Sequence, residues 1–195
     1  MKKIINIEKM TNTKFLNLYK ITYLKDDGGT FDYFVSSRRN LENLEIKKPK
    51  TDAVRAVPYI RKNGKIYVVL IKEFRHALGK FIYGTPAGLV DGNELSSTAV
   101  IRELKEEIGA KVLKLEKSQE TAYSSAGLTD ETIECFYAEV ALTGKQHLEE
   151  TENITYELVE LDNLPAFVKN NKFCLQSALL LKAFFYETKF KSMEK

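Results

Sequence analysis

Cysteine and histidine are scarce in this chain of 195 residues. Cys135 and Cys174 are its only cysteines, which excludes a disulfide framework. His76 and His147 are its only histidines, so neither a structural zinc site nor a histidine-rich metal centre is expected. Two thiols without a disulfide pattern are typical of a reducing compartment, and we therefore expect a cytoplasmic location.

Long apolar runs and a strong charge of one sign are also missing. The apolar stretch at 178–181 ends at Lys182 and is too short to cross a membrane, and no apolar segment of a signal peptide follows the first lysines. Lys and Arg number 30 and Asp and Glu number 27, so the net charge is only +3. That value does not indicate a nucleic-acid or membrane partner. The 44% of apolar and 29% of charged residues are ordinary for a globular protein.

The chain divides into two regions of different character. Residues 1–50 form a predicted β annex, with strand patterns at 15–23 and 30–37 on either side of an Asp-Asp-Gly-Gly turn. A polar break at 47–50 precedes residues 51–195, which we predict to be an α+β main domain. There the sequence predicts strands at 53–60, 66–73, 112–116 and 132–141, helices at 95–108, 165–170 and 175–186, and a frayed tail at 189–195.

The segment from Gly88 to Ala110, GLVDGNELSSTAVIRELKEEIGA, concentrates the residues that can carry chemistry. Glu103, Glu106 and Glu107 stand at i, i+3 and i+4, so they share one face of the predicted helix. A neighbouring apolar stripe is expected to bury the helix and to aim the carboxylates out of the core. A hard divalent cation, Mg²⁺ or Mn²⁺, would offset their mutual repulsion. A solvated acidic helix face is the alternative interpretation.

The same segment matches the Nudix box, G-x5-E-x7-R-E-U-x-E-E-x-G-U, in which U is a bulky aliphatic residue. The required residues are present as Gly88, Glu94, Arg102, Glu103, Leu104, Glu106, Glu107 and Gly109. The last U position departs from the pattern, because Ala110 is small. The chain therefore resembles the Nudix hydrolases. The resemblance implies the Nudix fold, a mixed β-sheet sandwiched between α-helices, and hydrolysis of a nucleoside diphosphate linked to another moiety.

The resemblance also implies roles for the residues of the box. Glu103 and Glu107 would be the main metal ligands, and Glu106 would be a further ligand or the catalytic base. Arg102 would pair with Glu94 or with a ligand carboxylate and orient it. A simple intrahelical pair of Arg102 with Glu103 or Glu106 is the alternative. The glycines at 88 and 92 suit tight backbone turns ahead of the helix.

Residues on either side of the box resemble those of ADP-ribose pyrophosphatases and related nucleotide-sugar hydrolases. The Pro-Ala-Gly run entering the box makes the carbonyl of Ala87 a further metal ligand by this resemblance. Arg75 would contact substrate phosphates, for which a guanidinium is suited, with a surface ion pair as the alternative. In the loop downstream of the box, at 123–131, Glu131 is the implied general base, and Asp130 is the alternative. The proline that this group carries in that loop is Ala126 here.

The N-terminal annex fits the same subfamily, in which such an annex crosses to a partner subunit, so we expect a homodimer. Arg39 ends the second annex strand and could reach a phosphate of the substrate. A basic strand end that discourages edge pairing is an equally good interpretation of Arg39.

The resulting prediction is metal-dependent hydrolysis of ADP-ribose, or of a related nucleoside diphosphate sugar, to a nucleoside monophosphate and a sugar phosphate. A nucleoside triphosphate pyrophosphohydrolase and a non-catalytic Nudix module that binds a nucleotide are the alternatives. The annex and the Pro-Ala-Gly run oppose the first alternative, and the complete set of box glutamates opposes the second. The sequence leaves open the base, the sugar, the choice between Mg²⁺ and Mn²⁺, and the choice among Glu131, Asp130 and Glu106 as base.

Overall fold

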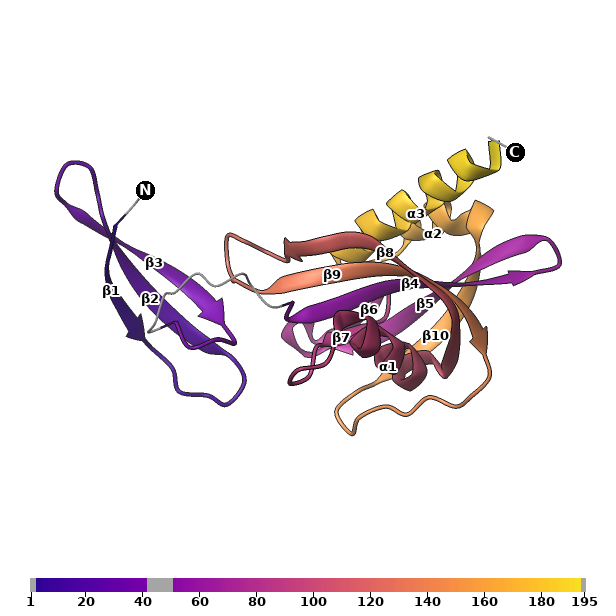
Figure 1. Cartoon of the computed structure of the whole chain (residues 1–195), viewed down its shortest axis with the longest axis horizontal. Coiled ribbons are helices and arrows are strands. Elements are labelled where there is room, and N and C mark those ends of the chain that lie inside the picture. Colours follow the sequence, from indigo (N-terminus) through magenta and orange to yellow (C-terminus); the bar gives the residue numbers. More distant parts are fainter. Residues whose placement is uncertain (1–2, 42–50, 194–195) are drawn as a thin grey trace. The chain divides into compact units, whose positions relative to one another are not determined.

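A computed structural model describes residues 3–41 and 51–193 of the chain (Figure 1). The chain forms two compact units. The first comprises Met1–Asp52 and Thr121–Ile133, and the second comprises Ala53–Glu120 and Glu134–Lys195. The polar break predicted at 47–50 lies outside the described residues.

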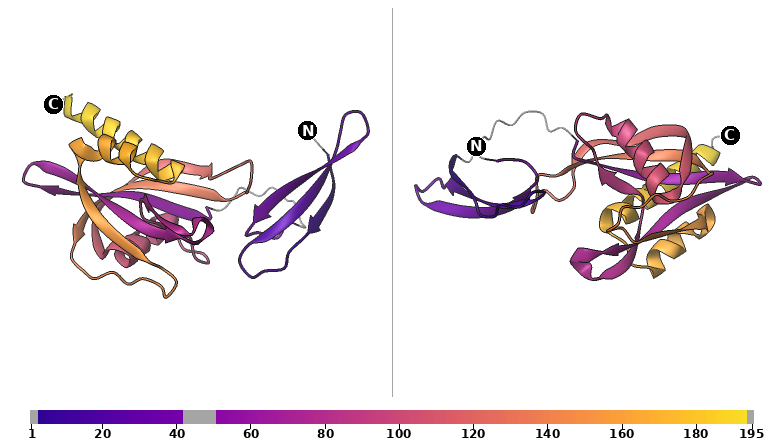
Figure 2. Two further views of the ribbon diagram at one scale, coloured as in Figure 1. Left: turned by 180° about the vertical axis from the view of Figure 1, so that it is seen from behind. Right: turned by 90° about the horizontal axis from the view of Figure 1, so that it is seen from below.

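The first unit is built on a three-stranded antiparallel sheet with the order β1-β2-β3 (Figure 2). Its strands are β1 (Ile4–Lys9), β2 (Asn17–Leu24) and β3 (Thr30–Ser37). The two strands predicted here are confirmed, and β1 was not predicted. Its small core consists of Tyr19, Ile21, Val35 and Leu41. The segment 121–133 joins this unit through β3, since Ser36 N donates to Leu128 O at 3.0 Å.

The second unit is organised around a sheet with the strand order β10-β5-β4-β9-β8. The short strands β6 and β7 pair with β5 and β4, respectively. The bounds are β4 (Ala53–Lys62), β5 (Lys65–Arg75), β6 (Lys80–Gly84), β7 (Ala87–Leu89), β8 (Ala110–Tyr123), β9 (Thr132–Leu142) and β10 (Ile154–Glu160). Three α-helices, α1 (Ser96–Ile108), α2 (Leu164–Asn170) and α3 (Leu175–Met193), and two 3₁₀ turns, η1 (His76–Leu78) and η2 (Leu161–Asn163), complete the unit.

Alternating side chains of the central strands form two separate cores. In β4 and β5 one set packs with α1, namely Val54, Ala56, Val69 and Ile71. The set between them packs with α2 and α3, namely Val57, Tyr59, Val68 and Leu70. Because successive residues of a strand point to opposite faces, α1 covers one face of the sheet and α2 and α3 cover the other (Figure 1). This confirms the predicted fold, a mixed sheet between helices.

Three details of the main domain differ from the predictions. The strand predicted at 112–116 is longer, since β8 runs from Ala110 to Tyr123. The predicted frayed tail is wrong up to Met193, because α3 continues to that residue. Lys189 forms an ion pair with Asp162 and lies over the Phe185 ring, and Lys191 pairs with Glu116 at 3.5 Å. The strands β6, β7 and β10 were not predicted from the sequence. A strand as short as β7, with three residues, gives little pattern, and β10 buries its side chains without regular alternation. Within the described ranges, no helix is both long and apolar enough to span a bilayer.

Candidate active site

Helix α1 carries the acidic residues of the box, and packing against the sheet fixes its orientation. Its core face consists of Ala99, Val100, Leu104 and Ile108. Gly109 ends the helix in the left-handed conformation at φ 63°, and its N–H donates to Lys105 O at 3.1 Å. The predicted helix and its glycine end are confirmed. Glu103 and Glu107 do not face solvent, however, since they are only 8% and 3% exposed. A solvated acidic face is therefore the wrong interpretation for these two residues.

Strand β7 passes directly against the carboxylate of Glu103. It pairs with β4 so that Gly88 lies opposite Val54. A Cβ added to Gly88 would lie 2.0 Å from Glu103 Oε1, so any larger residue at this position would force the Glu103 carboxylate to move. The predicted tight turn is wrong at Gly88, which lies in a strand. At Gly92 a positive φ of 45° supports the prediction of a turn.

Glu107 is the most deeply buried carboxylate of the site. Burial raises its pKa well above the usual value, and the nearby carboxylates of Glu103, Glu73 and Glu152 raise it further, while the backbone of Ala87 opposes them by hydrogen bonding. Its Oε2 is buried and has no hydrogen-bond partner among the described residues. A buried carboxylate in such a negative field is costly when ionised, unless a cation compensates it.

Arg102 connects the helix to the loop that precedes it. Its Nη2 contacts Glu94 Oε1 at 2.8 Å and donates to Leu89 O at 3.0 Å. Its Nη1 contacts Glu103 Oε1 at 2.7 Å and Glu106 Oε2 at 3.2 Å. The hydrogen bond to Glu94 raises the pKa of Arg102 most, burial of the guanidinium opposes that rise, and the hydrogen bond to Glu103 adds to it, so the pKa lies above its usual value. Both the predicted pair with Glu94 and the intrahelical pairs are present, so Arg102 orients carboxylates on two segments at once.

The chemistry of these donors fits a hard divalent cation. Within residues 3–41 and 51–193, no three Asp, Glu, His or Cys side chains are grouped so as to hold a metal ion. Arg102 Nη1 engages the carboxylates of Glu103 and Glu106. Glu107 Oε2, by contrast, is buried with no hydrogen-bond partner among those residues, where neighbouring carboxylates concentrate negative charge. A carboxylate-bound Mg²⁺ or Mn²⁺ would compensate that charge.

Two acidic residues outside the box belong to the same electrostatic environment. Glu73 lies near the end of β5 and Glu152 precedes β10, and both raise the pKa of Glu107. The pairing of these strands sets Ile154 opposite Glu73, which brings distant parts of the chain together. Neither residue was predicted from the sequence. An acidic run, Glu-Glu-Thr-Glu, directly before a β-forming segment was the signal that could have revealed Glu152.

Arg75, the expected phosphate contact, ends β5 and forms an ion pair with Glu73 at 2.9 Å. Burial raises the pKa of Glu73, and Arg75 and Arg55 oppose that rise. The surface ion pair considered for Arg75 is thus present. A phosphate contact would require Arg75 to share its guanidinium with Glu73 or to release it.

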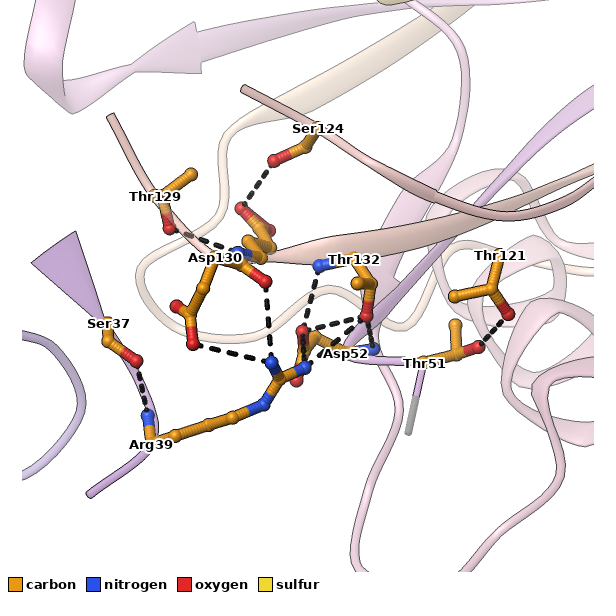
Figure 3. Close-up of polar contacts among 10 residues, drawn as sticks. Ser37, Arg39, Thr51, Asp52, Thr121, Ser124, Thr129, Asp130 and Thr132 are labelled. Carbon is orange, nitrogen blue, oxygen red and sulfur yellow. Dashed lines mark hydrogen bonds and ion pairs between the residues drawn. The ribbon is translucent and has the colours of Figure 1, made fainter. Parts of the chain in front are cut away.

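The remaining predicted site residues lie in the first unit. Arg39 contacts Asp130 Oδ2 at 3.3 Å and also forms an ion pair with Asp52 (Figure 3). Glu131 is half-buried rather than exposed, and its Oε2 accepts a hydrogen bond from Ser124 Oγ at 3.3 Å. Of the two candidate bases in this loop, Asp130 is therefore ion-paired and Glu131 is held by a hydroxyl.

Comparison with known proteins identifies the class of the chain. The model of the NUDIX domain matches residues 49–177, so the chain belongs to the Nudix family. A nudix hydrolase of Caenorhabditis elegans is 32% identical over 192 residues, covering 93% of this chain and 83% of the relative. Family membership and the box, which matches at every position except the last, together mark the chain as a Nudix pyrophosphohydrolase.

Relatives with more specific names cover smaller parts of the chain. An ADP-ribose pyrophosphatase of Bacillus subtilis is 33% identical over 129 residues, covering 65% of this chain and 66% of the relative. An ADP-sugar pyrophosphatase of Mus musculus is 30% identical over 108 residues, covering 53% of this chain and 46% of the relative. A crystal structure of an ADP compounds hydrolase matches with a TM-score of 0.75 at 18% identity, over 98% of this chain and 95% of that one, which supports the fold.

Proposed function

We propose that this Nudix enzyme hydrolyses the pyrophosphate bond of ADP-ribose, or of a related nucleoside diphosphate sugar, with a divalent cation as cofactor. The observation that carries the proposal is the buried Oε2 of Glu107, which has no hydrogen-bond partner within the described ranges and lies near the carboxylate of Glu103. The names of the Bacillus subtilis and mouse relatives support the substrate class. The products would be a nucleoside monophosphate and a sugar phosphate.

The residues of the box would bind the cation and keep its ligands in place. Glu103 and Glu107 would be its main protein ligands, with Glu106 and the Ala87 carbonyl as further donors. Mg²⁺ or Mn²⁺ bound there would neutralise charge on the pyrophosphate and acidify water. Arg102 would hold Glu103 and Glu106 through Nη1 and the Glu94 loop through Nη2. Arg75 would contribute a guanidinium to the phosphates.

The reaction also needs a group that accepts a proton. Water attacks one phosphorus atom, its new P–O bond forms as the bridging P–O bond breaks, and the released proton passes to a carboxylate. We propose Glu131 as that base, because Asp130 is engaged by Arg39 and Glu106 by Arg102. The two phosphate monoesters then leave as products.

A substrate panel with product identification tests the proposal. The panel comprises ADP-ribose, ADP-glucose, UDP-glucose, GDP-mannose, diadenosine polyphosphates and dNTPs, each with Mg²⁺ and with Mn²⁺. We expect ADP-ribose or another nucleotide sugar to be converted most efficiently. Preferred release of pyrophosphate from dNTPs would favour a triphosphate pyrophosphohydrolase instead, and nucleotide binding without turnover would favour a non-catalytic module.

We also propose that the enzyme is a homodimer that buries the annex. The three strands and the segment before β2 expose many apolar side chains, namely Ile5, Phe15, Leu16, Leu18, Phe31, Tyr33 and Phe34. An apolar surface of this kind on so small a sheet is typical of a protein interface. The annex would therefore be covered by a second copy of the chain.

A further inference from the structure

We propose that Arg39 and Asp52 are positioning residues for Glu131, an inference that rests on the proposed role of Glu131 as the base. The two residues fix the chain on both sides of Glu131 (Figure 3). The annex would thus serve catalysis by holding the loop that carries the base. Arg39, which the sequence suggested as a phosphate contact, would act within the protein instead.

Arg39 holds the residue that precedes Glu131. Its Nη1 donates to the backbone carbonyl of Asp130 at 3.4 Å and to Asp130 Oδ2 at 3.3 Å. Its Nη2 forms an ion pair with Asp52 and donates to Thr132 Oγ1 at 3.4 Å. Its own backbone N–H donates to Ser37 Oγ at 2.9 Å, at the end of β3. The guanidinium fork is therefore committed to protein acceptors, and a fork of this geometry is effective at fixing two segments together.

Asp52 holds the residue that follows Glu131. Its Oδ2 accepts hydrogen bonds from Thr132 N at 2.8 Å and from Thr132 Oγ1 at 2.9 Å. Its backbone N–H in turn donates to Thr132 O at 3.2 Å. These reciprocal bonds attach the start of β9 to the segment that enters β4. Asp52 also binds Arg39, so one carboxylate joins the contacts before and after Glu131.

Glu131 is thus fixed through its backbone more than through its carboxylate. Its N–H donates to Thr129 Oγ1 at 3.2 Å, and its carbonyl accepts from Ser124 N at 2.9 Å. The carboxylate itself accepts a hydrogen bond from a neutral hydroxyl, that of Ser124. Among the residues that the structure describes, no cation forms an ion pair with this carboxylate. A catalytic base needs such an arrangement, in which the backbone is held in place and the carboxylate keeps its charge.

A double-mutant cycle tests this inference. Steady-state kcat and KM are measured for wild type, Arg39→Gln, Glu131→Gln and the double variant, with ADP-ribose or whichever member of the panel the wild type hydrolyses. We expect Arg39→Gln to lower kcat by roughly 10- to 100-fold, since misplaced catalytic groups can lose about that much. KM should stay within about threefold, because no ground-state contact is lost. In the Glu131→Gln background, Arg39→Gln should cause no further loss.

Two controls separate positioning from loss of the fold. Arg61→Gln removes another ion-paired arginine, whose Nε lies 3.4 Å from Glu139, and should leave both kinetic parameters unchanged. Asp52→Asn preserves the shape of the side chain and should lower kcat in the same way. It replaces Arg39→Gln in the test if that variant does not fold. Hydrogen exchange of peptides from 121–133 should accelerate in both variants, while that of α1 stays as in the wild type.

Three outcomes would overturn the inference. A raised KM with unchanged kcat would make Arg39 a substrate contact. If the loss of kcat in the double variant equals the product of the losses in the two single variants, Arg39 does not act through Glu131. A wild-type kcat in Glu131→Gln would show that Glu131 is not the base, and the proposed hydrolase function would still stand. Failure of the proposed function has a different signature, since the wild-type enzyme would then hydrolyse no nucleotide sugar.

Discussion

The carboxylate of Glu103 lies so close to Gly88 that a Cβ on the glycine would be 2.0 Å from Glu103 Oε1. This contact joins β7, at the start of the Nudix box, to α1, the helix within the box. The strand also contains Ala87, the proposed carbonyl ligand, so the backbone and side-chain donors are held against each other. The first glycine of the box therefore leaves the space that the Glu103 carboxylate occupies.

Gly88→Ala should impair catalysis more than stability. Relieving the overlap must move Glu103, and overpacking of this kind costs about 1–3 kcal/mol of unfolding free energy. We expect kcat/KM to fall by about 100-fold, because a displaced ligand misplaces the reacting groups. Gly84→Ala is the matched control, since its Cβ would meet Ser177 Oγ at an ordinary 3.6 Å. Equal activities of the two variants would contradict the role given to Gly88.

Local spacing explains why much of the box could be predicted from the sequence. Helix α1, its end at Gly109 and the pair of Arg102 with Glu94 depend on residues close to one another in the chain. Glu152 depends on the pairing of β10 with β5, which a single sequence does not reveal. The environment of Arg39 likewise depends on segments 13 and 91 residues away. Its ion pairs could therefore not be foreseen.

Glu107→Gln should abolish the stabilisation of the protein by metal. In excess EDTA we expect the variant to melt no lower than the wild type, because it loses a buried carboxylate whose Oε2 has no hydrogen-bond partner in the described part of the chain. A metal concentration of 100 times Kd should stabilise the wild type by about 2.7 kcal/mol, or roughly 5–10 °C in Tm. Differential scanning calorimetry with and without Mg²⁺ or Mn²⁺ measures both effects. Lys105→Gln, on the same helix, should retain the full metal shift.

Glu131→Gln should lower kcat and leave metal affinity nearly intact. Loss of a general base typically costs 10²–10⁴-fold, and we expect a fall in that range. The measurements are kcat at saturating substrate and the metal-dependent Tm shift of the same preparation. If kcat stays within a few-fold of wild type, the base lies elsewhere, and Glu106→Gln becomes the next variant to test.

Cys174 should react with iodoacetamide before Cys135. Burial raises the pKa of the Cys174 thiol, but Arg55 and the hydrogen bonds with Ser177 outweigh it and leave the pKa below its usual value. Burial raises the pKa of Cys135, and Arg55 only partly opposes that rise. A lower pKa leaves more thiolate at pH 7–8, and the thiolate is the nucleophile. Time-resolved peptide mass spectrometry measures both rates, and faster labelling of Cys135 would contradict the expectation.

Polar substitutions on the annex should dissociate the proposed dimer. Light scattering at micromolar concentration should give twice the 22.3 kDa of one chain for the wild type. The double variant Phe15→Ser and Phe34→Ser removes two side chains that are 67% and 50% exposed, and should shift the mass to that of one chain. Leu179→Ser, at an exposed position of α3, is the control. A fully active wild-type monomer would refute the dimer.

The most direct test of the proposed function follows ADP-ribose by ³¹P NMR with the wild-type enzyme and Glu107→Gln. With Mg²⁺ or Mn²⁺ we expect the wild type to convert the pyrophosphate signals into those of AMP and ribose phosphate, and excess EDTA to stop the conversion. Glu107→Gln should turn over at least about 100-fold more slowly. Full wild-type activity in excess EDTA, or an undiminished rate in Glu107→Gln, would contradict a metal-dependent pyrophosphohydrolase built on the carboxylates of α1.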